Sequence, residues 1–157
     1  MGAVEDRLAE LGLSVPEVVP PVAAYIPALR EGNLVFTSGQ LPMVAGQMAH
    51  TGKVGDGPGL VSPDDAKALA QACALNAIAA VKGVIGDLDQ VTRVVKVVGF
   101  VASDPSFTGQ PGVVNGASEL LGKAFGDKGI HARSAVGVVA LPLDAPVEVE
   151  IVVAVAG

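Results

Sequence analysis

The chain has 157 residues, a formal net charge of −6 and a pI near 4.7, and half of its residues are apolar. A length of this order predicts one domain over residues 1–157, with residues 1–19 as an N-terminal helix and connector. The acidic charge and the few aromatic residues argue against nucleic-acid binding, and the single cysteine, Cys73, excludes an internal disulfide and a multi-cysteine zinc site.

The apolar runs are interrupted by Lys, Asp, Pro or Gly before they reach the roughly 18–20 residues that span a membrane. The N-terminus lacks the basic start and apolar middle of a signal peptide. We therefore expect a cytoplasmic protein without a membrane-spanning segment. Because a chain that is so apolar and so poor in charge commonly hides surface between subunits, we also expect a permanent oligomer.

The first elements are short. Val4, Leu8 and Leu11 recur at helical spacing before Gly12, which indicates a short amphipathic helix. Three prolines in residues 14–22 indicate an extended connector.

Two strands and a glycine-rich segment follow the connector. Residues 23–42 predict two strands around a turn at residues 31–33, and Pro27 places the first of them at a sheet edge or at a bulge. Residues 43–61 contain GKVGDGPG, which invites comparison with a phosphate-binding loop. The segment lacks the GxxxxGK[ST] spacing, so we expect a flexible connection there, with His50 in solvent.

Long helices then alternate with strands. Ser62, proline and two acids form a helix start, and the helix is expected over residues 63–85 with Cys73 as a buried, small apolar residue. The order β-β-α-β-α-β-β predicts an α+β fold, with both long helices on one face of a mixed sheet. The other elements expected in this half are a strand at 91–103, a helix at 110–126 and strands at 134–143 and 146–155.

Arg133 is a charged residue directly before an apolar strand. A guanidinium buried there without a partner costs several kcal/mol, so it needs a carboxylate. Physical reasoning alone favours an ion pair with Glu148 or Glu150, which lie two residues apart and therefore on one face of their strand. The alternative is a two-pronged grip on the carboxylate of a substrate.

The pairing of the last two strands bears on this choice. A simple hairpin would set Arg133 opposite Ala154 and leave Glu148 roughly 20 Å away along the strand. The two could then meet on one ligand only if the strands do not pair in that way, or if Glu148 comes from a neighbouring subunit. We favour a site at a subunit interface.

Other candidates surround the end of the second strand. Gly39 would allow a ligand to approach the backbone closely. Ser38 has no adjacent His–Asp pair, so a serine nucleophile has little support. Tyr25, the only tyrosine, is either the wall of a pocket with a hydroxyl handle or an ordinary packing residue.

Three stretches together resemble the RidA/YjgF family of imine deaminases, also known as endoribonuclease L-PSP proteins. These stretches are VFTSGQLP (35–42), ARSAVGVVALP (132–142) and VEVEIVVAV (147–155), and the resemblance covers roughly residues 20–156. The N-terminal helix, the longer loop at 43–61 and the phrase GFVAS resemble a less characterised branch. The resemblance implies a chorismate-mutase-like fold, a homotrimer with ligand clefts between its subunits, and no metal or other cofactor.

The resemblance also implies a reaction, the hydrolysis of enamines and imines such as 2-aminoacrylate to 2-keto acids and ammonia. Arg133 would hold the substrate carboxylate with help from the backbone N–H of Ala135, and Glu148 would orient or activate water. Residues matching the family's cleft wall are Tyr25, Ser38 and Gly39.

The chain departs from the family pattern near this site. Ala-Ala-Tyr-Ile-Pro replaces Gly-Pro-Tyr-Ser-Gln around Tyr25, and Pro105 stands where many members carry a cleft asparagine. Ala135 replaces a frequent cysteine, and His131 replaces a common proline. These changes leave carboxylate binding intact and leave the pocket for the substrate side chain undefined. We assign His131 a structural role at the entrance of its strand.

Three functions are compatible with these residues. The first is an imine deaminase, and the second is a non-catalytic binder or sensor of small carboxylate metabolites on the same trimeric scaffold. The third is a ribonuclease, which only the family's older label suggests and which the acidic charge and the lack of a paired histidine base oppose.

Overall fold

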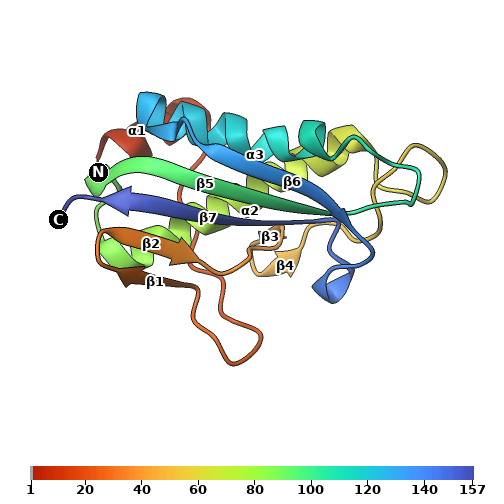
Figure 1. The fold of residues 1–157 in the computed structure, drawn as a ribbon, viewed down its shortest axis with the longest axis horizontal. Coiled ribbons are helices and arrows are strands. Elements are labelled where there is room, and N and C mark those ends of the chain that lie inside the picture. The colour runs from red at the N-terminus through yellow and green to blue at the C-terminus, as the bar shows by residue number, and fades with distance from the viewer. Residues whose placement is uncertain (1) are drawn as a thin grey trace.

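Strands that alternate apolar and polar residues need a cover on their apolar face, and two long helices supply it here. The computed structural model describes residues 2–157 and shows a five-stranded sheet of order β1-β2-β7-β5-β6, with the helices behind it (Figure 1). The expected α+β fold with both long helices on one face is confirmed. The helices are α1 (Ala3–Glu10), α2 (Pro63–Ile85) and α3 (Gln110–Phe125), and the strands are β1 (Ala28–Glu31), β2 (Leu34–Thr37), β3 (Met43–Val44), β4 (Gln47–Met48), β5 (Val91–Ala102), β6 (Ala132–Val138) and β7 (Val147–Val155).

The last two strands do not form the hairpin considered above. β5 lies between them: it pairs with β6 in parallel and with β7 antiparallel. β6 also begins and ends earlier than expected, and the chain turns at Pro142–Asp144, where Leu143 and Asp144 have φ values of 58°. The long, β-branched β5 offers hydrogen-bonding groups along both edges, so each late strand pairs with it rather than with the other.

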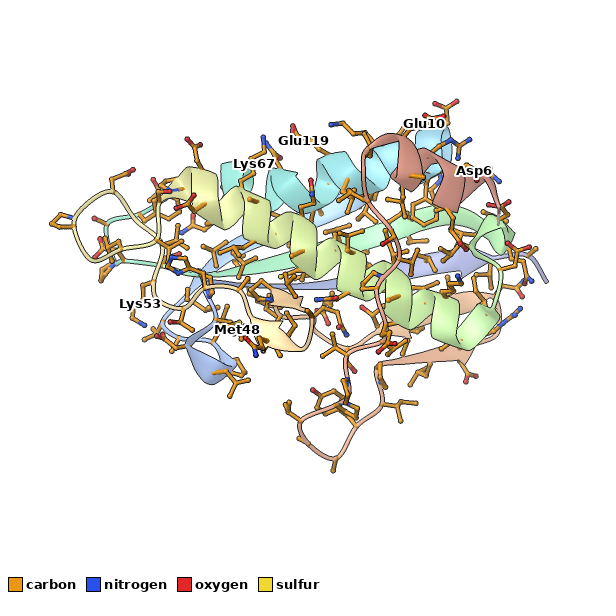
Figure 2. All side chains as sticks on the ribbon, turned by 180° about the vertical axis from the view of Figure 1, so that it is seen from behind. Asp6, Glu10, Met48, Lys53, Lys67 and Glu119 are labelled. Atoms are coloured by element: carbon orange, nitrogen blue, oxygen red, sulfur yellow. The ribbon has the colours of Figure 1, made fainter. Side chains whose placement is uncertain are left out.

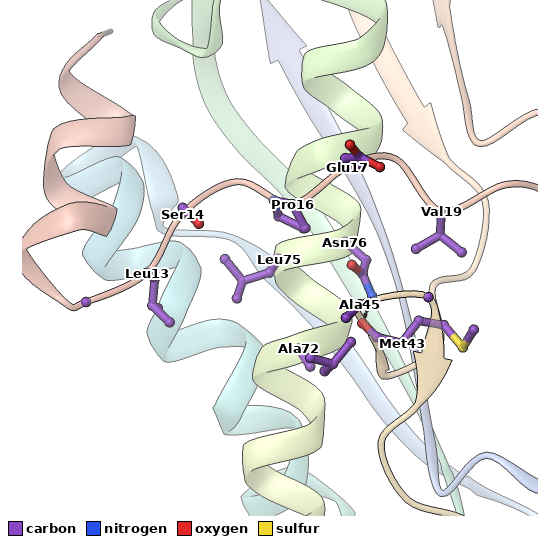
Figure 3. A pocket seen from close by; sticks show the side chains of 13 residues that line it. Leu13, Ser14, Pro16, Glu17, Val19, Met43, Ala45, Ala72, Leu75 and Asn76 are labelled. Carbon is purple, nitrogen blue, oxygen red and sulfur yellow. Dashed lines mark hydrogen bonds between the residues drawn. The ribbon is translucent and has the colours of Figure 1, made fainter.

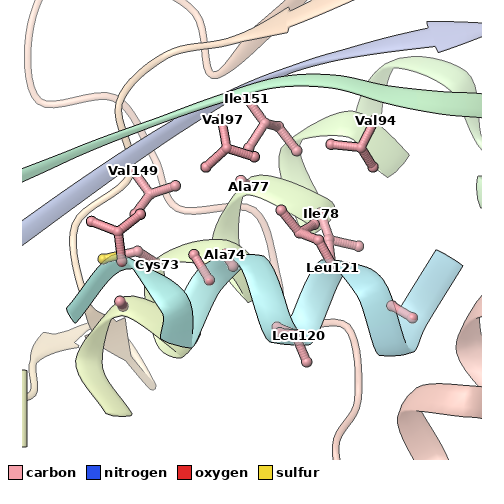
Figure 4. Packing of buried hydrophobic residues seen from close by; sticks show 14 of the residues in the cluster. Cys73, Ala74, Ala77, Ile78, Val94, Val97, Leu120, Leu121, Val149 and Ile151 are labelled. Carbon is pink, nitrogen blue, oxygen red and sulfur yellow. The ribbon is translucent and has the colours of Figure 1, made fainter. Parts of the chain in front are cut away.

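The core lies between the sheet and the two long helices (Figure 4). Alanines on the inner face of α2, such as Ala74 and Ala77, leave room for larger residues from the sheet, such as Val97 and Ile151. Cys73 is fully buried among them as expected, and burial raises the pKa of its thiol.

Helix α2 does not fit the expectation that no segment is long and apolar enough to span a membrane. By length and composition Pro63–Ile85 is apolar enough to cross a membrane, because Lys67 and Lys82 interrupt it only near its ends. Half of its apolar window is nevertheless buried against the protein's own sheet and α3. On the outer surface Lys67 pairs with Glu119 of α3 at 2.9 Å (Figure 2).

The N-termini of α2 and α1 are capped in two different ways. Ser62 caps α2 as expected, because its Oγ accepts a hydrogen bond from the backbone N–H of Asp65 at 3.1 Å. Helix α1 is capped from outside: the Asp89 carboxylate accepts from the N–H groups of Ala3 at 2.9 Å and Val4 at 3.1 Å. These hydrogen bonds lower the pKa of Asp89 and attach the N-terminal helix to the turn before β5.

The glycine-rich segment 43–61 contains more regular structure than expected. β3 and β4 form a short hairpin around Ala45 and Gly46, which have φ values of 50° and 80°. Val54 is fully buried, and its N–H donates to the carbonyl of Ala102 at 2.7 Å. His50 is exposed, as expected.

Gly116 provides a test of this packing. A Cβ added at Gly116 would overlap the backbone carbonyl of Lys67, so α3 can cross α2 this closely only without a side chain there. We expect Gly116→Ala to lower the free energy of unfolding by about 1–3 kcal/mol or more. Gly122→Ala, in the same helix but with no atom within 4 Å of the new Cβ, should raise it by up to about 1 kcal/mol. Urea titrations of both variants measure the two effects, and equal changes would contradict this account.

Candidate functional site

Arg133 lies on β6, which is one edge of the sheet. It is in register with Val97, whose side chain is buried beneath the helices, so the Arg133 side chain also leaves the sheet on the helix side. There it meets α3. Nη1 donates to Asn115 Oδ1 at 2.8 Å and to Ser118 Oγ at 3.2 Å, and Nη2 donates to the carbonyl of Pro111 at 3.3 Å. The spacing of these three partners places them along one stripe of the helix.

Arg133 has no carboxylate partner among residues 2–157. The ion pairs in this part of the chain are Lys67–Glu119 and Lys82–Glu5, so the ion pair of Arg133 with Glu148 or Glu150 is ruled out. A guanidinium has five N–H donors, and three neutral acceptors take three of them. Its Nε–H and one Nη2–H have no partner in the described chain, which leaves two donors and an uncompensated positive charge for an anion.

Glu148 lies on the other face of the sheet. Along β7 the residues Val147, Val149 and Ile151 are buried, whereas Glu148 and Glu150 are half-buried on the face that the helices leave uncovered, which confirms the predicted alternation. We call this the open face of the sheet, and it also carries Leu34, Phe36, Phe100 and Val136.

The Glu148 carboxylate packs directly on Gly39. A Cβ at position 39 would lie only 2.7 Å from Cδ of Glu148, so the absence of a side chain there is a condition for this arrangement. Burial and, to a lesser extent, the charge of Glu150 raise the pKa of the Glu148 carboxyl. A carboxylate with a raised pKa is a stronger base than an ordinary one.

Tyr25 and Ser38 lie next to Gly39. The Ser38 hydroxyl donates to the carbonyl of Ile26 at 2.6 Å, and its N–H donates to the carbonyl of Pro27 at 2.8 Å. The hydroxyl of Ser38 therefore ties two chain segments together. Tyr25 and Gly39 line a small cavity of about 40 Å³, and the Tyr25 hydroxyl accepts from the N–H of Val22 at 3.3 Å.

The candidate residues thus form two groups. The Glu148 group consists of Tyr25, Ser38, Gly39 and Glu148, and the Arg133 group consists of Arg133 and Ala135, which is in register with Gly99. From strand spacings and registers the Cα atoms of Arg133 and Glu148 are about 14 Å apart, and the two side chains leave opposite faces. A single chain does not bring the two groups together.

Asn115 and Ser118, near Arg133, were not predicted as site residues, and His131 was predicted only as a structural residue. Asn115 and Ser118 contact the guanidinium, and His131 contacts Ser118 through Nε2 at 2.8 Å. The available signal was two polar residues spaced three apart beside the apolar stripe of a helix. That signal does not say which strand the helix covers.

A cavity of about 610 Å³ lies elsewhere, between the N-terminal connector, α2 and the β3–β4 hairpin (Figure 3). Leu13, Pro16 and Leu75 give it apolar walls. Asn76 is the buried polar residue in its lining, and its Nδ2 donates to the carbonyls of Leu41 and Met43, both at 3.0 Å. Asn76 therefore holds the chain that follows β2, and the cavity includes neither Arg133 nor Glu148.

Comparison with known proteins places this arrangement in a family. A family model described as "YjgF/chorismate mutase-like, putative endoribonuclease" matches residues 5–154. The chain therefore belongs to the YjgF/chorismate mutase-like family, which confirms the resemblance and the fold inferred from the sequence. No group of three or more His, Cys, Asp or Glu residues that could hold a metal ion is found among residues 2–157.

Individual relatives extend this result. Protein TCP17 of Trypanosoma cruzi is 43% identical over 155 residues, covering 97% of this chain and 94% of that protein. The crystal structure of Atu1372 from Agrobacterium tumefaciens, a protein of unknown function, is 44% identical with a TM-score of 0.90 and covers 98% of this chain and 93% of its own. The structure of E. coli TdcF with bound serine is 21% identical with a TM-score of 0.62, covers 90% and 94% of the two chains, and shows a likeness of fold alone.

Glu148→Gln tests the energetic consequence of the half-buried carboxylate. Because folding raises the pKa of Glu148, its ionised form weakens the fold above the folded pKa, and this penalty disappears as the pH falls below the unfolded pKa of about 4.3. The variant should therefore melt at a higher temperature than wild type at pH 8, with a difference that shrinks toward zero near pH 4. Glu31→Gln, at an exposed position on β1, is the control. A stabilisation that is the same at both pH values would argue against this explanation.

Proposed function

We propose that the protein hydrolyses imines and enamines of 2-amino acids to 2-keto acids and ammonia, in clefts between the subunits of a homotrimer. The observation that carries this proposal is the Arg133 guanidinium, which neutral acceptors hold in place and which has no carboxylate partner in the described chain. A substrate carboxylate supplies that partner. The serine bound to E. coli TdcF is a 2-amino acid with such a carboxylate, which supports the same class of ligand for this fold.

The separation of the two groups of residues supports a site between subunits. The open face exposes 39% of Phe36 and 43% of Val136, apolar residues that association of copies would cover. Association through this face also brings Glu148 of one subunit toward another chain, whose sheet edge carries Arg133. In this proposal each cleft takes Arg133 and Ala135 from one subunit and the Glu148 group from the next.

The reaction then needs only orientation and one base. Arg133 and the N–H of Ala135 hold the carboxylate, and Glu148 takes a proton from a water molecule as its oxygen attacks the C=N carbon. That proton passes to nitrogen to give a carbinolamine. A second proton, from its new hydroxyl group, then reaches nitrogen as the C–N bond breaks, so that ammonia leaves and the carbonyl of the 2-keto acid forms. An enamine first takes a proton on carbon and loses one from nitrogen to become the imine. Because imines already hydrolyse in water, this small set of groups is sufficient.

Arg133→Ala should abolish the acceleration of imine hydrolysis, because the carboxylate loses its charged partner. The assay generates imines in situ with an amino-acid oxidase and follows release of the 2-keto acid with and without the protein. Arg30→Ala is the matched control, since Arg30 bonds only the backbone carbonyls of Gly32 and Ala156 on the far edge of the sheet. A wild-type protein that gives no acceleration would refute the proposed activity.

A mixing experiment tests whether the site is shared between subunits. Arg133→Ala and Glu148→Gln should each be inactive alone, but a mixed trimer contains one cleft in which both residues are native. Random association at equal amounts should therefore restore about a quarter of the wild-type sites over the whole population, and about a third in the isolated mixed trimers. Co-expression with two different affinity tags and an activity assay on the mixed species measures this. Failure of mixed trimers to regain activity, when both parent variants form trimers, would contradict a cleft that takes Arg133 from one subunit and Glu148 from the next.

The geometry of Arg133 is also compatible with a non-catalytic binder or sensor of carboxylate metabolites. That function predicts a higher melting temperature in the presence of 2-keto acids, lost in Arg133→Ala, without any turnover of imines. RNA cleavage that persists through purification and is lost in Arg133→Ala would instead favour the ribonuclease named in the family description.

A further inference from the structure

A chain of hydrogen bonds leads from the backbone to the Arg133 guanidinium. Nδ1 of His131 lies 2.6 Å from the carbonyl oxygen of Gly129, and Nε2 lies 2.8 Å from Ser118 Oγ. The same Ser118 oxygen accepts from Arg133 Nη1 at 3.2 Å. His131 and Ser118 thus link α3, the turn before β6 and the arginine.

The donors and acceptors in this chain have one consistent direction. The Gly129 carbonyl can only accept, so the proton of a neutral His131 ring resides on Nδ1 and leaves a lone pair on Nε2. The Ser118 hydroxyl then donates to Nε2. Its oxygen keeps its lone pairs for Arg133, so every group in the chain uses the role that its chemistry allows.

Local structure explains why these residues meet. After α3 ends, the chain forms the short turn η2 (Gly126–Gly129) and folds back on the helix. A Cβ at Gly129 would overlap the carbonyl of Leu121 and lie 3.0 Å from Cα of Gly122, so this close return requires a glycine. The return places His131 beside Ser118, which lies about two turns before the end of α3.

We propose that His131 and Ser118 are positioning residues that orient the Arg133 guanidinium for the substrate carboxylate. Ser118 and Asn115 occupy both N–H groups of Nη1, so the plane of the guanidinium is held before a ligand binds. The free Nε–H and Nη2–H are then presented in a constant direction. This inference rests on the proposed function, because it names residues that serve the same carboxylate site.

A competing interpretation is that Ser118, with a histidine nitrogen at 2.8 Å, is an activated nucleophile. The donated hydrogen bond from Arg133 argues against it, because it occupies a lone pair and lowers the nucleophilicity of the oxygen. The two interpretations differ in kinetics. Loss of a positioning residue weakens substrate binding, whereas loss of a nucleophile removes the chemical step.

The first measurement reports the hydrogen-bond chain without depending on activity. The chain contains only two histidines, His50 and His131, so a long-range ¹H–¹⁵N correlation spectrum is assigned with His131→Gln alone. We expect the proton of His131 on Nδ1 in the wild-type protein at pH 8, and a change in its Nε2 signal in Ser118→Ala. A wild-type His131 with its proton on Nε2 would overturn the proposal.

The second measurement addresses the substrate. Ser118→Ala and His131→Leu should each raise KM for the imine and Kd for a 2-keto acid by about tenfold, the weight of one hydrogen bond to a charged group, with kcat within about twofold of wild type. His131→Gln keeps an acceptor for the Ser118 hydroxyl and should stay within about twofold in KM. His50→Leu and Ser106→Ala, which alter exposed residues away from Arg133, are controls for loss of a histidine and of a serine hydroxyl.

The outcomes separate this inference from the proposed function. A fall in kcat with unchanged KM in Ser118→Ala, or variants that bind and react as wild type does, would overturn the positioning role. A wild-type protein that neither binds 2-keto acids nor accelerates hydrolysis overturns the proposed function and this inference with it. In that case the histidine spectrum still tests the geometry. A proton on Nδ1 of His131 would show that the hydrogen-bond chain exists and that only the chemistry assigned to the site is wrong.

Discussion

The position of β5 between β6 and β7 is the constraint on which the candidate site depends. Because β5 pairs in parallel with β6, the Arg133 strand becomes an edge of the sheet, and its arginine leaves the face that α3 covers. Because β5 pairs antiparallel with β7, Glu148 lies two strands away on the open face. One pairing pattern therefore separates the cation from the carboxylate, and a site that uses both needs a second copy of the chain.

Among residues 2–157, neither the Arg133 guanidinium nor the Glu148 carboxylate has an ion-pair partner. Arg133 has neutral hydrogen-bond partners, so no internal carboxylate competes with one that arrives from solution. Glu148 is half-buried beside Glu150 and packs on Gly39, which raises its pKa and weakens the folded chain at neutral pH. Residues that break local rules of stability in this way are typical of functional sites. The ring of His131 and the hydroxyl of Ser118 form a hydrogen bond with each other, and the same Ser118 oxygen accepts a hydrogen bond from Arg133.

Much of the fold was predictable because its signals are local. Ser62 at the start of α2 and the alternation of Val147, Glu148 and Val149 report the conformation of their own segments. The failures involve partners far apart in the chain. The cap of α1 comes from Asp89, the segment of Val54 pairs with the end of β5, and the two final strands each pair with β5. Such contacts depend on which segments meet when the chain folds, and the hydrophobic periodicity of one segment does not specify its partner.

By itself the sequence determined the type and approximate bounds of most elements, the face on which Glu148 lies, the unusual charge of Arg133 beside an apolar strand, and the family resemblance that gave Arg133 a carboxylate ligand. These properties follow from hydrophobic periodicity, capping residues and short motifs, all of which act within one segment. The tertiary structure alone decided that Arg133 meets Asn115 and Ser118 instead of a glutamate, and that His131 stands behind them. The physical reason is that each strand could pair with several other strand edges. The pairing and register that form determine which side chains share a face and come within hydrogen-bond distance.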